Sequence, residues 1–322
     1  MKYFRKLIVS LALACVPWAM AQAQAVPSGS IRIIVPAAAG GASDIAVRMI
    51  GERLQRAMGQ PVIIDNRPGA DGILAAQAAA QAPADGQTLF FGITSTHVSN
   101  VVLRRKLPYD PARDFAPVTL LGTTALVLLV NPNLPVKSAA ELVAYAKANP
   151  GKLAVASSYV SARMAGELFK QVARVDMLHV PYKGTVAALT DLIGGQVQVM
   201  FGDLASAMPH VQSGKLRALA VTSAHRTLAA PQLPTVAESG LPGYEMTGWG
   251  GFFVPARTPA AAVARLNAEL VAIIASPEVR QRMLESATEV APGTPAALGS
   301  MIAADVEKWR NLAELAHVEV TD

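Results

Sequence analysis

The chain has 322 residues and a formal net charge of +5, with 52% hydrophobic and 16% charged residues. This length allows two lobes of ordinary domain size, each with its own core. Because the basic residues form no run interleaved with aromatic residues, we expect no nucleic-acid partner.

The N-terminus has the three parts of a secretory leader. Lys2, Arg5 and Lys6 precede the apolar stretch 7–18, and 19–25 offers overlapping Ala-x-Ala cleavage sites. We expect a signal peptide in residues 1–25, cleaved after Ala25; a membrane anchor is disfavoured because the apolar run is shorter than the ~20 residues that span a bilayer. Without the three basic leader residues the net charge falls from +5 to +2.

The single cysteine, Cys15, lies inside this leader. A lipoprotein would be anchored through it, but the preceding Leu11-Ala12-Leu13-Ala14 sets the usual leucine one place too early, and apolar residues continue beyond the cysteine. The chain after residue 25 therefore has no disulfide, no thiolate metal site and no cysteine nucleophile.

The rest of the chain is organised around its first strand, loop and helix. Ile31 to Val35 predicts a buried strand, and Pro36 ends it. The Gly40-Gly41 pair permits a tight turn, Ser43 or Asp44 can cap the next helix, and the helix extends to Met58. Backbone amides at such a corner suit a carboxylate or phosphate. A plain strand–helix connection explains the same residues, and neither a GxGxxG nor a P-loop motif indicates a nucleotide.

The pattern then continues as alternating strands and helices. Strands at 62–65 and 88–93 flank a helix at 71–81, so we expect parallel strands whose following loops, 36–44, 66–72 and 94–97, share one edge of a sheet. Backbone amides, hydroxyls and Arg67 in these loops suit an anionic or polar ligand. We expect a solvated connection at 101–117, rather than a functional basic patch, and an apolar segment at 117–130 that crosses to a second lobe.

A second strand–helix series follows, and its loops mirror the first set, which predicts a cleft between two lobes. A capping box at Ser138 starts a helix, and a strand at 248–255 returns across the hinge, with Trp249 either lining the cleft or, as we prefer, packing at the lobe junction. The expected domains are residues 26–125 with 246–322, and 126–245. Further strands are expected at 153–156, 177–180, 197–201 and 216–221. Three further helices are expected to end near residues 148, 172 and 193, and three more to span 259–275, 277–286 and 295–315.

Nothing in the sequence predicts a catalytic centre, a cofactor or a metal site. The five histidines have no HExxH spacing, and no Gly-x-Ser-x-Gly motif activates a serine. His179 could reach the cleft, although a structural role is favoured. Asp44 and Asp203 could form an acid–base pair across the cleft, but capping and hydrogen bonds to loop amides explain them more simply.

Taken together, an ordered series of short motifs resembles the Bug-type extracytoplasmic solute receptors of tripartite tricarboxylate transporters. The resemblance covers essentially the whole chain after the leader. The matching segments are Val35-Pro36 with Gly40, Gly41 and Asp44; Asp65 to Gly72; Asp85 to Leu89; Tyr109 to Pro111 with Asp114-Phe115; Ala165 to Phe169; Val180 to Gly184; Asp191 to Val197; Pro234-Thr235 with Glu238; Leu241 to Glu245; and Trp249 to Gly251.

The resemblance implies a two-lobed type II periplasmic-binding fold, with a hinge of two crossing segments and a solute between the lobes. It implies a periplasmic, monomeric receptor that captures a small carboxylate and delivers it to a membrane permease, with no enzymatic activity. The ligand-binding residues it implies are Gly40, Gly41, Ala42, Ser43 and Asp44 in one lobe and Ser157, Ser158, Tyr159 and Ser161 in the other, with Thr94, Ser95 and Asp203 as further candidates.

Two departures from the family pattern bear on the ligand. Ala37-Ala38-Ala39 replaces an aromatic residue and proline, and Ser157 to Ser161 forms a shorter loop without glycines. Tyr159 is expected to reshape the pocket, and Arg163, in place of a histidine, to add a cation. Two other functions use the same cleft: presentation of the closed form to a sensor kinase, or catalysis on the bound acid.

Overall fold

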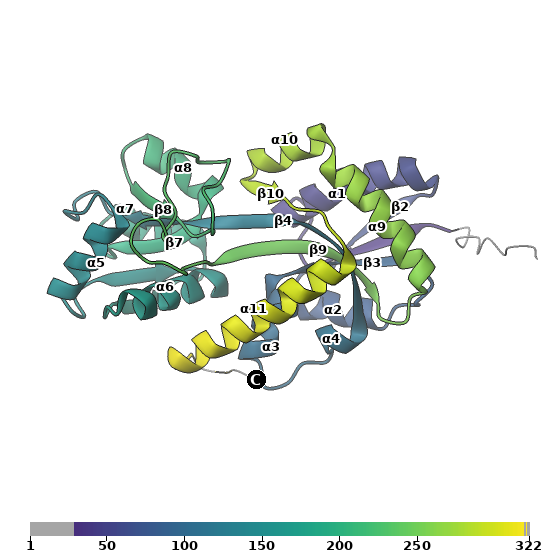
Figure 1. Cartoon of the computed structure of the whole chain (residues 1–322), viewed down its shortest axis with the longest axis horizontal. Coiled ribbons are helices and arrows are strands. Elements are labelled where there is room, and N and C mark those ends of the chain that lie inside the picture. Colours follow the sequence, from purple (N-terminus) through teal and green to yellow (C-terminus); the bar gives the residue numbers. More distant parts are fainter. Residues whose placement is uncertain (1–28, 319, 321–322) are drawn as a thin grey trace, which may run out of the picture.

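The computed structural model describes residues 29–318 and 320, so the expected leader lies outside the described residues. Two α/β lobes stand at the ends of a long sheet, and strands β4 (Phe115–Val130) and β9 (Thr247–Pro255) run from one lobe to the other (Figure 1). The strand order is β2-β1-β3-β9-β4-β7-β5-β6, with β8 and β10 also paired to β4. The expected two-lobed architecture with two crossing segments is present.

The first lobe begins with three parallel strands, as the sequence predicted. β1 (Ile31–Val35) lies between β2 (Val62–Asn66) and β3 (Thr88–Ile93), and β9 continues the sheet antiparallel to β3. Apart from Arg32, β1 is fully buried, which explains its β-branched composition.

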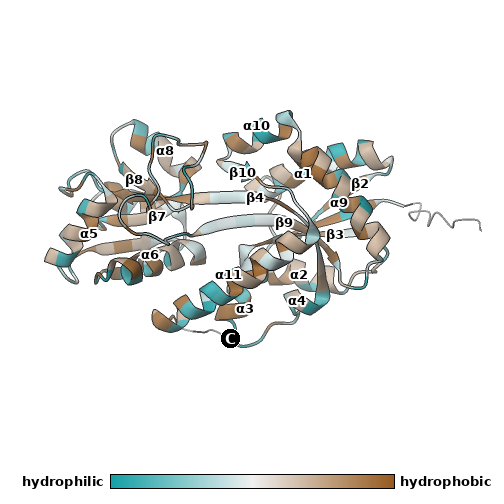
Figure 2. Cartoon of the chain, viewed as in Figure 1, coloured by the Kyte–Doolittle hydropathy of each residue, from teal (hydrophilic) through white to brown (hydrophobic). Residues whose placement is uncertain are grey.

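Helices cover both sides of this part of the sheet. α1 (Ala42–Met58) buries Val47, Ile50 and Leu54 at helical spacing and ends at Gly59, which adopts the left-handed conformation. The other helices of this lobe are α2 (Ile73–Ala80), α9 (Ala260–Ala275), α10 (Pro277–Glu285) and α11 (Pro295–Leu315). Figure 2 shows brown and teal segments alternating along several helices, the pattern of elements with one face against a core.

The second lobe repeats the parallel arrangement. β5 (Ala154–Ser157) pairs in parallel with β6 (Leu178–Pro181) and β7 (Val199–Asp203), while β7 and β8 (Arg217–Val221) run antiparallel to β4. Its helices are α5 (Ala139–Ala148), α6 (Val160–Ala173), α7 (Thr185–Ile193) and α8 (Leu204–Gln212).

The two crossing strands, β4 and β9, are less hydrophobic in the middle of the molecule than in the lobes. There Gly122, Thr123 and Thr124 of β4 pair with Gly250, Trp249 and Gly248 of β9, and both strands are pale in Figure 2. The expected domain boundary at 125/126 falls within β4, and the boundary at 245/246 falls just before β9. Gly122 and Gly250 allow close packing here, because a Cβ on Gly122 would meet the Glu289 backbone and a Cβ on Gly250 would meet the Phe91 ring.

The structure differs from the sequence-based expectations at three places. The segment 101–117 is not wholly solvated: Tyr109 is 5% exposed, its hydroxyl donates to the Thr96 carbonyl at 2.8 Å, and short helices α3 (Asn100–Leu103) and α4 (Pro111–Asp114) border it. A 3₁₀ turn, Ala70–Gly72, precedes α2, and Ala70 and Asp71 within it take positive φ, so α2 begins only at Ile73. The three-residue strand β10 (Thr288–Val290) is too short for a periodic pattern to reveal it.

Within the part of the chain that the structure describes, no single helix is both long and apolar enough to cross a membrane. The consecutive helices α9 and α10 meet that test only together, and a bend of 68° separates them.

A cleft between the lobes

A cleft of about 570 Å³ lies between the two lobes, with β4 and β9 at its base. Its walls combine hydroxyls, small residues and a few large apolar side chains. The lining residues are Ala42, Ser43, Ala46, Phe91, Ile93, Thr94, Ser95, Leu121, Gly122, Thr124, Ser161, Asp203, Leu204, Ala205, Ser206, Gly248, Trp249, Gly250, Met283, Ser286 and Thr288. Six of the residues predicted from the sequence are therefore brought together: Ala42, Ser43, Thr94, Ser95, Ser161 and Asp203.

Three helices begin at this cleft: α1 at Ala42, α6 beside Ser161 and α8 at Leu204. No described side chain caps the first turn of any of them. Of the helices that begin away from the cleft, α5, α10 and α11 have a side-chain cap, and α2, α7 and α9 do not. The first N–H groups of a helix have no partner within the helix, and its N-terminus carries a partial positive charge. These partial positive charges face the cleft, and no cationic side chain stands among its described lining residues.

The hydroxyls in the cleft fall into two groups. Among the described residues, those of Ser43 and Ser161 have no hydrogen-bond partner and face the cleft. Thr94 is engaged instead, because its Oγ1 accepts the backbone N–H of Trp249 at 2.9 Å. Ser95 donates its hydroxyl to the Asp71 carbonyl at 3.1 Å. Ser43 and Ser161 are thus the hydroxyls most available to a ligand.

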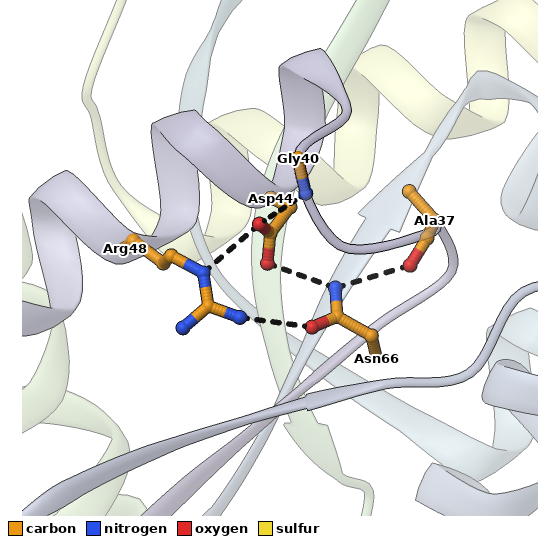
Figure 3. A network of polar contacts seen from close by, with 5 residues as sticks. All are labelled: Ala37, Gly40, Asp44, Arg48 and Asn66. Carbon is orange, nitrogen blue, oxygen red and sulfur yellow. Dashed lines mark hydrogen bonds and ion pairs between the residues drawn. The ribbon is translucent and has the colours of Figure 1, made fainter.

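Asp44 does not reach into the cleft but fixes the loop that leads to α1 (Figure 3). One carboxylate oxygen accepts the Gly40 N–H at 2.8 Å and Arg48 Nε at 2.9 Å, and the other accepts Asn66 Nδ2 at 2.9 Å. The bond from Arg48 lowers the pKa of Asp44 to about 2, against the opposing effect of burial, with Gly40 and Asn66 contributing further. The hydrogen bond between Asp44 and a loop amide, which the sequence analysis expected, is therefore present.

The expectation that Ser43 or Asp44 caps α1 was wrong. Gly41 is the N-cap residue, and its extended backbone lets the chain enter the helix without a capping side chain. Gly40, with φ of 81°, makes the turn that brings its N–H onto Asp44. Gly40, Gly41 and Asp44 therefore shape the loop, while Ala42 and Ser43 face the cleft.

Asp203 occupies the N-cap position of α8, yet its side chain does not cap that helix. Its Oδ1 accepts the Tyr159 hydroxyl at 2.7 Å, so the expectation that Asp203 serves as a cap was wrong. Burial and, secondarily, the Asp203 charge raise the pKa of the Tyr159 hydroxyl far above its ordinary value, which keeps it a hydrogen-bond donor.

The other predicted serines lie outside the cleft lining. The Ser157 hydroxyl bonds His179 Nε2 at 2.6 Å, and the Ser158 hydroxyl bonds that of Thr185 at 3.1 Å. Burial, followed by the charge of Arg163, lowers the pKa of His179. Arg163 thus acts on His179 and is not among the residues that line the cleft, where the sequence had suggested an added cation.

Loop 66–72 also points away from the cleft. Arg67 Nε donates to Asp65 Oδ2 at 2.9 Å, and the Arg67 side chain borders a separate groove beside α2 with Leu74 and Gln77. Arg67 therefore lies apart from the predicted ligand-binding residues that line the cleft.

Sequence reasoning missed the contributions of the crossing strands and the C-terminal region. Thr124, Ser206, Met283, Ser286 and Thr288 come from segments with no binding motif. Trp249 combines the two roles considered for it: it lines the cleft, and its indole Nε1 donates to Asp305 Oδ2 at 3.0 Å. The Gly-Trp-Gly-Gly sequence around it was the available signal, because small neighbours leave an aromatic side chain next to open space.

With the cleft defined, the relationship to known proteins can be stated. Residues 46–317 match the model of the tripartite tricarboxylate transporter family receptor. The chain belongs to this family. A UPF0065 protein from the tcbD–tcbE intergenic region of Pseudomonas sp. strain P51 is 38% identical over 89% of this chain and 86% of its own length. Protein BugT of Bordetella pertussis is 32% identical over 88% of each chain.

Solved structures share the fold. R. palustris Rpa4515 with adipate has a TM-score of 0.77 and 34% identity, covering 92% of this chain and 99% of that one. MatC of Rhodopseudomonas palustris with bound malate has a TM-score of 0.70 and 33% identity, covering 89% of this chain and 99% of that one. This member of the family therefore has the two-lobed periplasmic-binding fold expected from its motifs.

Proposed function

We propose that this protein is a periplasmic receptor that captures a small organic carboxylate in the cleft between its lobes and delivers it to a tripartite tricarboxylate-type permease. The observation that carries the proposal is the meeting of three uncapped helix N-termini, from both lobes, at one cleft. Membership of the receptor family, and two structural relatives with adipate and malate, support the same ligand class.

The carboxylate is held by amides and hydroxyls in this proposal. The first-turn N–H groups of α1 and the Ser43 hydroxyl form one wall, and Ser161 at the start of α6 forms the other. No Lys, Arg or His stands among the described lining residues, so hydrogen bonds rather than a cationic side chain hold the ligand carboxylate in this proposal. Gly40, Gly41 and Asp44 act behind this wall, by setting where α1 begins.

Closure of the lobes around the ligand is the expected functional motion. β4 and β9 form the hinge in this proposal, because they are the two strands that run from one lobe to the other. A hydrogen bond also joins the C-terminal region to the second lobe: the Leu228 N–H donates to Glu289 Oε1 at 2.7 Å.

A thermal-shift screen of the purified protein against mono-, di- and tricarboxylates tests capture. A ligand present at a hundred times its dissociation constant stabilises the folded protein by ~2.7 kcal/mol. Ala42→Trp should abolish the shift, because the indole occupies the cleft in front of the α1 amides. The matched control is Ile45→Trp: Ile45 lies on the same turn, is 61% exposed and does not line the cleft. Equal loss of binding in both variants would contradict the proposed site.

Delivery is tested separately, by recovering membrane partners on the immobilised protein with and without the ligand found in the screen. Ligand-dependent recovery of permease subunits supports the proposal. Recovery of a sensor kinase alone would replace delivery with signalling. Conversion of the bound acid, detected by mass spectrometry after incubation, would identify an enzyme instead.

A further inference from the structure

The cleft has an unexpected charge distribution for a site that takes an anion. Asp203 is the only charged residue among the lining residues that the structure describes. A second negative charge in the same cleft weakens the binding of a carboxylate, unless the two groups are kept apart and Asp203 itself meets a hydrogen-bond donor.

The position of the Asp203 side chain is set by the fold. Aspartate at an N-cap normally accepts the N–H groups of its own helix, but Asp203 does not do so for α8. Its Oδ1 instead accepts the hydroxyl of Tyr159, the N-cap residue of α6. Its other oxygen, Oδ2, accepts no hydrogen bond from any residue in the described part of the chain. One acceptor atom is thus held in place and left available at the cleft.

This arrangement makes the two walls of the cleft different. In the second lobe the Asp203 carboxylate lies between the starts of α6 and α8 and offsets their positive ends. In the first lobe no acidic side chain lines the cleft at the start of α1, since Asp44 is turned into its loop. A ligand therefore meets hydrogen-bond donors on one wall and a charged acceptor on the other.

We infer that Asp203 is a specificity-determining residue, which selects carboxylates that also carry a hydroxyl or ammonium group. The inference rests on the proposed function: the ligand carboxylate lies at the start of α1, and its donor group lies on Asp203 Oδ2. Tyr159 is a positioning residue, because it touches Asp203 and holds the carboxylate at the required angle.

Malate, aspartate and succinate form a matched set of four-carbon dicarboxylates for isothermal titration calorimetry. They differ at one carbon, which bears a hydroxyl, an ammonium group or hydrogen. A hydrogen bond to a charged group changes affinity by about tenfold or more. The wild-type protein should therefore bind malate or aspartate at least tenfold more tightly than succinate.

Asp203→Ala should remove this preference in a way that general damage cannot reproduce. Affinity for the donor-bearing ligand falls at least tenfold, whereas succinate binds as well as before or more tightly, because the like charge is gone. Tyr159→Phe should reduce the preference severalfold and leave succinate binding unchanged.

A second tyrosine–aspartate pair in the same lobe gives the control. The Tyr182 hydroxyl donates to Asp191 Oδ2 at 2.8 Å, and neither residue lines the cleft. Tyr182→Phe and Asp191→Ala should leave the ligand preference unchanged. Equal binding of the three ligands, or equal losses for all of them in Asp203→Ala, would overturn the role of Asp203 while the proposed receptor function stands. Absence of binding by every carboxylate in the wider screen would overturn both.

Discussion

Replacing Asp44 by asparagine should cost this protein about 2 kcal/mol of stability near neutral pH. The carboxylate is 2% exposed and accepts three donors: the Gly40 N–H, Arg48 Nε and Asn66 Nδ2. Asparagine keeps the shape but loses the charge, and its own amide group then faces other donors. The lowering of the Asp44 pKa from 3.8 to about 2 corresponds to about 2 kcal/mol of stabilisation of the folded state.

The sign of the pH dependence follows from the direction of that shift. Because folding lowers the pKa of Asp44, its contribution is complete above about pH 4 and disappears as the pH falls toward 2. Urea unfolding followed by circular dichroism should show a wild-type advantage of about 2 kcal/mol at pH 7, narrowing to roughly 1 kcal/mol near pH 3.

Glu52→Gln provides the control, because Glu52 is exposed on the same helix and makes no described ion pair. Its unfolding free energy should equal that of the wild type at both pH values. An Asp44→Asn deficit that stays constant between pH 7 and pH 3, or no deficit at all, would refute this account of the loop.

Two further substitutions test the packing and the closure of the cleft. Gly92→Ala should destabilise the first lobe by about 1–3 kcal/mol, because the new Cβ would lie 2.3 Å from a ring carbon of buried His97. Gly293→Ala is the control: its Cβ would meet open space, so the unfolding free energy should change little. Equal effects of the two substitutions would contradict the packing argument. Glu289→Ala removes the acceptor of the Leu228 N–H. Calorimetry should show ligand binding weakened a few-fold, while the midpoint of thermal unfolding changes little. Unchanged affinity would show that this hydrogen bond does not favour the closed form.

The architecture could be predicted because it depends on local patterns. Ile31, Ile33 and Val35 indicated a buried strand, Gly59 marked the end of α1, and the alternation of strands and helices required parallel sheets. Tyr109 was placed wrongly because the charged residues around it conceal one aromatic side chain that packs inside. β10 was missed because its three residues are held by pairing to distant β4 rather than by their own pattern.

The candidate site was less predictable, because side-chain direction is decided by tertiary contacts. The sequence located the loops after β1, β3 and β5, and it named both Ser43 and Ser161. It could not show that Ser157 turns to His179 while Ser161, four residues further along the chain, lines the cleft. Nor could it show that Asp203 forgoes its own helix for Tyr159, 44 residues away in sequence.

The most direct test of carboxylate capture at the helix N-termini is an amide NMR titration of the ¹⁵N-labelled protein with the tightest ligand from the carboxylate screen. The largest shifts should fall on the first-turn amides of α1, at Ala42 and Ser43, and on Ser161 at the start of α6. Saturating shifts confined to the groove beside α2, around Leu74 and Gln77, would place the ligand elsewhere and contradict the account.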